Sequence, residues 1–142
     1  MSTDPNCIFC RILRGEMPSV KIHEDDEIFA FMDVMPQSPG HCLVIPKRHA
    51  ANIYEVSANE AATLIRATHR LAQAVNQALK PDGLAIFQFN GGEAGQTVFH
   101  IHFHLVPRYA GVEMRMHARE MVAKEVLQPH ADKIGLAMLT RI

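Results

Sequence analysis

The sequence predicts an α+β fold in a single domain. Three observations indicate it: one long helical pattern, short apolar runs typical of strands before and after it, and the absence of repeats, linkers and low-complexity tracts. One helix among several mostly antiparallel strands is an α+β arrangement. A chain of 142 residues is also long enough for one hydrophobic core without disulfide or metal staples.

Three strands are expected before the long helix. Residues 20–23 and 27–33 form the first two, joined by a tight turn at Asp25 and Asp26. A loop rich in Pro and Gly follows at residues 35–40, and then a short apolar run from His41 that ends at Pro46.

The helix is expected to begin at a capping box formed by Ser57 and Glu60, whose side chains satisfy free amides of the first turn. Pro81, Asp82 and Gly83 end it. Apolar and small residues recur at helical spacing and predict its buried stripe: Ala61, Leu64, Ile65, Thr68, Leu71, Ala72 and Val75.

Two further strands are expected at residues 84–90 and 98–106, separated by a glycine-rich loop at 91–95. From about Val112 onward a weaker helical periodicity is interrupted at Pro129.

Composition and charge exclude several classes of protein. A formal net charge of −1, without a basic or acidic block, argues against broad binding to nucleic acid or an anionic membrane. There is no apolar run of the roughly 20 residues that a transmembrane helix needs, and the first residues lack the pattern of a signal peptide. Three cysteines do not form a disulfide framework. We therefore expect a cytoplasmic protein.

Three histidines in strict alternation carry most of the functional signal. In a strand, His100, His102 and His104 would line one face, while Ile101, Phe103 and Leu105 would fill the core side. Two chemistries fit: a metal site with imidazole ligands, or a histidine nucleophile that attacks phosphorus. The glycine-rich loop directly upstream favours phosphorus chemistry, because its backbone amides can approach phosphate oxygens closely.

These residues resemble a known family. The run from Gly95 to Arg108, Gly-Gln-Thr-Val-Phe-His-Ile-His-Phe-His-Leu-Val-Pro-Arg, is similar to the signature of the histidine triad (HIT) family. The similarity covers residues 6–110 and includes Ile8-Phe9, Phe31-Met-Asp33, the segment from Pro39 to Pro46, and Asn90-Gly91. Residues 111–142 lie outside it, and we treat residues 1–142 as one HIT domain.

The resemblance implies a HIT-like fold with a five-stranded sheet and a carboxyl-terminal helical segment, in a two-fold homodimer. It implies hydrolysis of nucleoside 5′-monophosphate conjugates, with purine nucleotides as partners, through a nucleotidyl-histidine intermediate. His102 would be the nucleophile, and His104, His41 and Thr97 would act on the phosphoryl and leaving groups. The substrate-binding residues would be Asp33, Asn90, Gln96, Val98, Ile8, Phe9, Val34 and Leu43.

Cys7 and Cys10 form a second constellation, for which zinc binding, redox chemistry and an incidental pair are all open from the spacing alone. The resemblance implies a structural zinc ion, not needed for the chemical step, held by Cys7, Cys10, His49 and His100. Two thiolates and two imidazoles suit a closed tetrahedral site.

Several alternatives stay open. The amino-terminal segment resembles the phosphoramidase branch of the family, whereas the Val-Pro-Arg108 ending resembles the dinucleoside polyphosphate hydrolases. A nucleotide-binding signalling protein without turnover and a zinc hydrolase with the three histidines as ligands are the rival functions. We also expect that deleting residues after Gly111 would change substrate choice more than it harms the fold.

Overall fold

The computed structural model describes residues 4–113 and 120–139, and its centre is a five-stranded antiparallel sheet in the order β1-β2-β3-β5-β4. The strands are β1 (Lys21–Glu24), β2 (Ile28–Met32), β3 (Cys42–Pro46), β4 (Gly83–Phe87) and β5 (Phe103–Arg108). The predicted α+β class and five-stranded sheet are confirmed.

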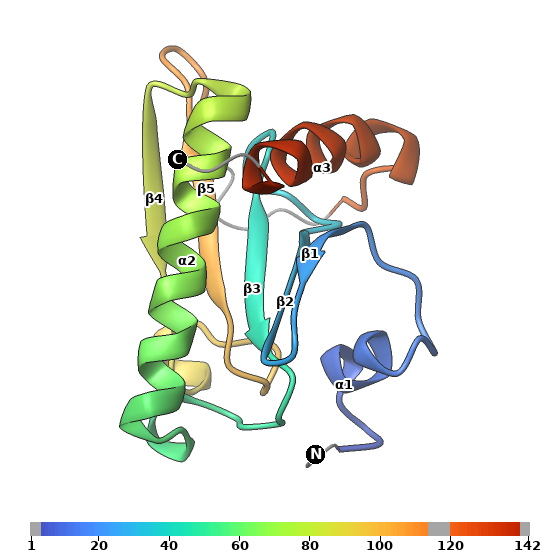
Figure 1. The fold of residues 1–142 in the computed structure, drawn as a ribbon, viewed down its shortest axis with the longest axis vertical. Helices are drawn as coiled ribbons and strands as arrows, with labels where there is room; N and C mark the ends of the chain where they lie inside the picture. Colours follow the sequence, from blue (N-terminus) through green and yellow to red (C-terminus); the bar gives the residue numbers. More distant parts are fainter. Residues whose placement is uncertain (1–3, 114–119, 140–142) are drawn as a thin grey trace.

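Two helices cover one face of the sheet (Figure 1). The long helix α2 (Ala58–Leu79) runs along the strands, and α3 (Lys124–Leu139) packs against it and against β1 and β2. Alternate residues of the strands, such as Ala30 and Val44, point into this main core and meet Leu71 of α2 and Ile134 of α3. The main core therefore lies between the sheet and these two helices.

A short helix, α1 (Ile8–Leu13), lies at the other face of the sheet (Figure 1). Phe9 of α1 packs with Phe29, Phe31 and Leu43, which are the residues of β2 and β3 that point away from the main core. The sequence analysis missed this helix, because six residues are too few to show helical periodicity. Cys7 caps it: its sulfur accepts the Cys10 amide at 3.4 Å.

The capping box of α2 is confirmed, since Ser57 and Glu60 each accept the other's main-chain amide. Most of the predicted stripe faces the core, but the inclusion of Ile65 was wrong: its side chain is 51% exposed. The adjacent Leu64, also in the predicted stripe, is fully buried, so its prediction is confirmed.

Two expected boundaries are corrected. The strand placed at 98–106 begins only at Phe103, because Ile101 bonds to the carbonyl of Ala50, beyond the end of β3. Pro129 does not interrupt α3, which passes through it. Pro129 removes only the hydrogen bond to the carbonyl of Glu125, close to the start of that helix.

Helix α3 bears on the predicted effect of a deletion after Gly111. It contributes Leu127, Ala131 and Ile134 to the main core, so the deletion would remove part of that core. Among the described residues, no helix is long and apolar enough to cross a membrane.

Candidate active site and metal centre

The three alternating histidines lie on one side of the sheet, as their spacing predicts. Ile101, Phe103 and Leu105 pack with the main core, while the Phe9 ring on the opposite face meets the rings of His100 and His102. Only His104 belongs to β5 itself. The other two precede it, in a segment held by the backbone of residues 46–51.

The hydrogen bond of His102 defines its reactive atom. Its Nδ1 lies 2.8 Å from the carbonyl oxygen of His100, which can only accept, so Nδ1 carries the proton and Nε2 keeps its lone pair. The acceptor lies two residues upstream in the same segment and not on an adjacent strand. Burial lowers the pKa of His102, which keeps the imidazole neutral at physiological pH.

His104, His41 and Asp33 surround this nucleophile candidate. The His104 ring centroid is 4.7 Å from that of His102, and His104 Nδ1 is 3.0 Å from His41 Nε2. Asp33 Oδ2 lies 3.5 Å from the same His41 nitrogen. Burial lowers the pKa of His41 to about 4 and of His104 to about 3, and it raises the pKa of Asp33 to about 6. At pH 7 both imidazoles are neutral and Asp33 is mostly ionised.

Two phenylalanines that the sequence analysis missed complete this side of the site. Phe87 lies opposite His104 in the β4–β5 ladder, and its ring stacks on the His104 ring at 4.5 Å and 20°. Phe89 stacks on Phe87 at 5.1 Å and also lies beneath Gly95, where a Cβ would come within 3.2 Å of the Phe89 ring. Their i, i+2 spacing next to a histidine strand is a signal that could have found them.

The polar side chains of the glycine-rich loop mostly bind the chain itself. Gln96 is buried: its Nε2 donates to the carbonyls of Ala51 and Val98, and its Oε1 accepts the Gly91 amide. Asn90 Oδ1 accepts the amide of Ile53 at 2.8 Å. These two residues therefore shape the loop, while Thr97 is exposed on it.

The apolar residues among the expected substrate-binding positions lie in different parts of the structure. Phe9 and Leu43 share the cluster beneath α1, and Val98 packs against it. Val34 packs instead against the main core, and Ile8 is exposed on α1.

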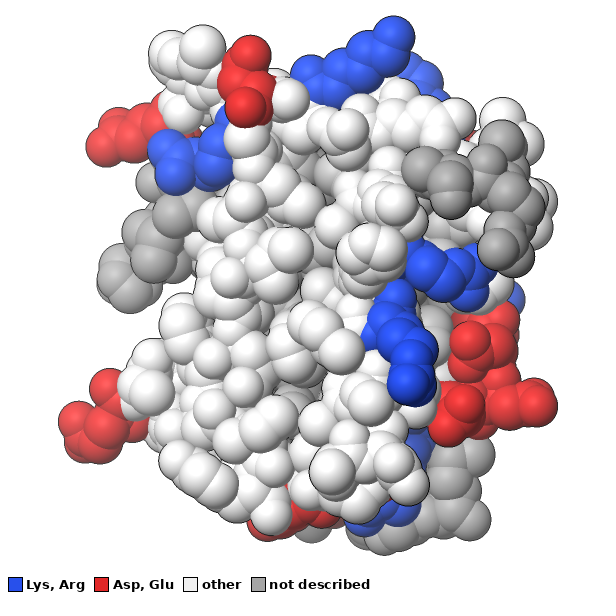
Figure 2. All heavy atoms as spheres, turned by 60° about the vertical axis from the view of Figure 1, so that its left-hand side comes forward, with Lys and Arg blue, Asp and Glu red and all other residues white. Residues whose placement is uncertain are grey.

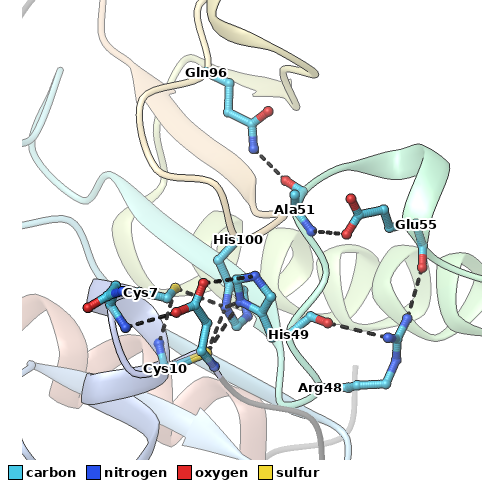
Figure 3. Close-up of polar contacts among 10 residues, drawn as sticks. Cys7, Cys10, Arg48, His49, Ala51, Glu55, Gln96 and His100 are labelled. Atoms are coloured by element: carbon cyan, nitrogen blue, oxygen red, sulfur yellow. Dashed lines mark hydrogen bonds and ion pairs between the residues drawn. The ribbon is translucent and has the colours of Figure 1, made fainter.

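The second constellation converges on one point. The ligand atoms of Cys7, Cys10, His49 and His100 all lie within 4.8 Å of one another, and Figure 3 shows the four side chains turned toward a common centre. His100 Nε2 donates to the Pro46 carbonyl at 2.8 Å, which leaves its Nδ1 lone pair facing the two sulfurs at 3.4 and 3.5 Å. In metal-binding histidines, the ring nitrogen that does not bind the metal characteristically donates a hydrogen bond, often to a main-chain carbonyl. The donor set therefore fits a tetrahedral zinc ion.

The segment that carries His49 is anchored to the start of α2. Arg48 forms an ion pair with Glu60. Figure 3 shows that Arg48 also donates to the carbonyls of His49 and Glu55. In the same segment, the carbonyl of Ala51 accepts a hydrogen bond from the Gln96 side chain, and the carbonyl of Ala50 accepts one from the Ile101 amide. The segment of residues 46–51 thus supports both the metal centre and the histidine segment.

Comparison with known proteins decides the family. The HIT domain model matches residues 14–111. The chain belongs to the HIT family. The "Protein hit" of Bacillus subtilis is 44% identical over 104 residues, which cover 73% of this chain and 72% of the relative. The adenosine 5′-monophosphoramidase hnt1 of Schizosaccharomyces pombe is 42% identical over 72% of this HIT chain and 74% of its own length. The adenylylsulfatase HINT3 of Arabidopsis thaliana is 34% identical over 82% and 62%.

Solved structures of HIT proteins agree with the fold. A HIT-like protein of Bartonella henselae has a TM-score of 0.88 at 41% identity, covering 96% of this HIT chain and 99% of its own. A zinc-bound histidine triad protein of Mycobacterium smegmatis has a TM-score of 0.82 at 31% identity, covering 94% of each chain. The zinc-bound relative places this protein with the zinc-containing members of the family.

Proposed function

We propose that this HIT protein hydrolyses nucleoside 5′-monophosphate conjugates at the α-phosphorus through a covalent intermediate on His102. The observation that carries the proposal is the 2.8 Å hydrogen bond from His102 Nδ1 to the His100 carbonyl. It leaves Nε2 as the free lone pair of a neutral, fixed imidazole, which is the state that a nucleophile needs. Relatives named as an adenosine 5′-monophosphoramidase and an adenylylsulfatase support a nucleotide substrate.

In the first step, His102 Nε2 attacks the α-phosphorus, and the bond to the leaving group breaks as the new N–P bond forms. His104, whose ring adjoins that of His102, would donate a hydrogen bond from its Nε2–H to the leaving atom. The leaving group departs with the bonding electron pair and takes its proton from solvent, to which the attacking water of the second step returns one. In the second step water attacks the phosphorus and the N–P bond breaks, which releases the nucleoside monophosphate and free His102. Backbone amides of the loop at 91–98 would face the phosphoryl oxygens, and Thr97 the leaving atom.

The nucleoside would occupy the face of the sheet that carries Asp33 and Leu43. In this arrangement Asp33 holds the ribose hydroxyls, while Phe9 and Leu43 provide the apolar wall for a purine base. Ile8 and Val34 would border the base, and Asn90 the phosphate–ribose region. Gln96 and the Val98 backbone would lie beside the α-phosphate.

We further propose that Cys7, Cys10, His49 and His100 hold a structural zinc ion. All four positions of a tetrahedron are filled by protein, so the ion would join α1 to the histidine segment and leave no site for a reacting water. The zinc hydrolase alternative is disfavoured, because His100 belongs to this cluster while His102 donates to a carbonyl.

A homodimer joined along β4 is the proposed assembly, and the three free cysteines fit a cytoplasmic location. β4 is an edge strand of the sheet and is uncharged from Gly83 to Phe87. Figure 2, in which the β4 side of the molecule comes forward, shows a broad uncharged area with charged side chains mainly toward its rim. An unpaired apolar edge is suited to pairing with a second copy.

The test compares wild type with His102→Asn on an adenosine phosphoramidate and on a diadenosine polyphosphate, with AMP release as the readout. We expect a loss of roughly 1,000-fold or more in folded protein, and a nucleotidyl adduct on wild type by mass spectrometry. The ratio of the two substrates identifies the branch. A wild type that binds AMP but cleaves neither substrate would leave the signalling protein as the function.

A further inference from the structure

The main-chain amide of Gln37 makes an unusual contact in the segment between β2 and β3. It donates to Nδ1 of His41 at 3.0 Å, and the His41 side chain is fully buried. Amides can only donate, so His41 Nδ1 must be an unprotonated acceptor. A neutral imidazole carries one proton, and in His41 that proton is therefore on Nε2.

The proton on His41 Nε2 determines the state of the next ring. Its nearest acceptor is His104 Nδ1 at 3.0 Å, with Asp33 Oδ2 farther away at 3.5 Å. His104 Nδ1 cannot donate in return, because His41 would then lack any proton. His104 Nδ1 is therefore an acceptor, and neutral His104 carries its proton on Nε2.

The segment around Gln37 is anchored well enough to impose this arrangement. Ser38 donates its hydroxyl to the Pro107 carbonyl at the end of β5, and Tyr109 donates to the Pro39 carbonyl at 3.0 Å. Gly40 has a φ of +93°, and a Cβ there would clash with the Leu79 side chain. The amide of Gln37 is thus fixed relative to β5, the strand that carries His104.

We propose that the Gln37 amide and His41 together fix the tautomer of His104, so that its Nε2–H faces the reacting phosphoryl and leaving group. His41 is then a positioning residue behind His104 and does not contact the phosphate. It also cannot pass a proton onward, since Nδ1 has none to give. The proposal rests on the proposed function, in which His104 donates to the leaving atom.

The same protonation argument decides whether Asp33, His41 and His104 could bind a metal ion, since their ligand atoms lie within 4.8 Å of one another. A metal ion on His41 Nε2 would displace its proton to Nδ1, where the Gln37 amide already donates. The cluster is therefore a hydrogen-bonded chain and not a second metal site.

The direct test is a long-range proton–nitrogen NMR spectrum of histidine-labelled wild type, loaded with zinc and free of substrate, at pH 7.5. Single His→Gln variants assign the rings. We expect His41 and His104 as Nε2–H tautomers and His102 as the Nδ1–H tautomer. A proton on His41 Nδ1, or a second equivalent of zinc that shifts the His41 signals, would overturn the proposal.

This spectrum involves no turnover, so it separates the two hypotheses. The expected tautomers with an active His102→Asn variant would reject the proposed function alone. Other tautomers together with an inactive His102→Asn variant would reject only the tautomer proposal.

Two matched pairs of variants test the consequence for catalysis. Gln37→Pro removes the amide hydrogen, whereas Gln37→Ala keeps it and discards a side-chain oxygen without a partner among the described residues. In folded protein we expect Gln37→Pro to lower kcat roughly 10- to 100-fold with KM unchanged, and Gln37→Ala to resemble wild type.

If Gln37→Pro fails to fold, the second pair is decisive. His41→Gln keeps a donor at the ε position and should retain at least about 10-fold more kcat than His41→Leu. Equal kcat in these two variants would contradict the proposal, because a purely structural role would not distinguish donor from non-donor.

Discussion

At the scale of single residues, the site places aromatic rings on both sides of its histidines. The Phe9 and His102 rings form a T-shaped contact with centroids 5.2 Å apart, while Phe87 stacks on His104. These contacts restrict the rotation of the two imidazoles that, in the proposed function, present specific nitrogen atoms to the substrate. Aromatic contacts of this kind contribute about 0.5–1.5 kcal/mol beyond their buried area.

Phe87→Leu should therefore lower kcat by roughly 2- to 10-fold, since the smaller side chain preserves burial but not the stacked geometry. KM should change little, because Phe87 contacts His104 rather than the expected nucleoside face. Steady-state kinetics on an AMP conjugate measure both. Val126→Ala is the control: it shortens an exposed apolar side chain on α3, which does not contact His104. An equal loss of kcat in both variants would refute a role for the stack.

The alternation of the histidine segment could be predicted from sequence, because the apolar residues between the histidines have one core to fill. The hydrogen bond from His102 to the carbonyl of His100 could not be predicted, since it depends on the backbone path of residues 98–102, which precede β5 and lie outside the sheet. Phe87 and Phe89 were missed for a similar reason. Only the β4–β5 register places them against His104 and Gly95.

At the scale of elements, one side chain at the start of α2, that of Glu60, both caps the helix and forms an ion pair. Glu60 closes the capping box with Ser57 and also pairs with Arg48, whose pairing lowers the pKa of Glu60 to about 2. The unfolded chain would titrate near 4.3. The ion pair thus stabilises the protein above about pH 4, and this contribution is lost as the pH falls toward 2.

Glu60→Gln keeps the capping hydrogen bond and removes only the charge. Because the pair is about one third exposed, we expect a cost of at most about 1 kcal/mol, or about 2–4 °C in Tm, at pH 7. The difference between the two melting temperatures should stay constant down to about pH 5 and narrow between about pH 4 and pH 2. Thermal melts across this range test it, and a difference that grows on acidification would contradict the assignment.

Helix α3 was recognised from sequence only as a weak periodic segment, and its role in the core was not. Pro129 and Gly135 both weaken a helical pattern, yet each is accommodated here. Pro129 lies near the helix start, and Gly135 lets α3 approach the carbonyl of Ile22, where a Cβ would come within 3.1 Å. Tertiary packing therefore determines that α3 forms, whereas the capping box of α2 could be recognised from the local sequence.

Ile134→Ala should cost about 2–5 kcal/mol, since Ile134 is fully buried where α3 meets the main core. Val126→Ala, at a position that is 57% exposed on the same helix, should stay within about 0.5 kcal/mol of wild type. Urea unfolding at one fixed protein concentration measures both. Similar values for the two variants would show that α3 does not complete the core.

At the scale of the whole molecule, the metal centre joins parts of the chain that are far apart in sequence. Its four residues come from α1 and its cap, the segment after β3, and the segment before β5. Without an ion, the buried sulfurs and imidazoles would lose the charge partner that offsets their desolvation. Bound zinc would therefore stabilise the folded state by linkage.

Cys7→Ser should lower the zinc content and the Tm together, as measured by elemental mass spectrometry and thermal unfolding. Cys42→Ala is the matched control. Cys42 is equally free and buried but lies in the main core, so its loss should reduce the Tm and leave the zinc content unchanged. Full zinc occupancy in Cys7→Ser would eliminate the proposed ligand set.

The edge of the sheet raises the question of assembly. Among the residues that the structure describes, β4 has a hydrogen-bonded neighbour only on the β5 side, and Ile86 is 46% exposed on it. Long apolar edges promote association unless charge or proline blocks them, and no residue of Gly83–Phe87 does so. Pairing of β4 with a second copy would cover this edge and bring two active sites onto one continuous sheet.

Ile86→Lys should therefore raise the dimer dissociation constant by roughly 10-fold or more, because a lysine at this edge must lose hydration or repel its symmetry mate. Val126→Lys introduces the same charge at an exposed apolar position on α3 and should leave the dimer intact. Sedimentation equilibrium of both variants and wild type gives the constants. If Val126→Lys dissociates the dimer and Ile86→Lys does not, the interface involves α3 and not β4. A wild type that is monomeric at all accessible concentrations would instead require each active site to function within a single chain.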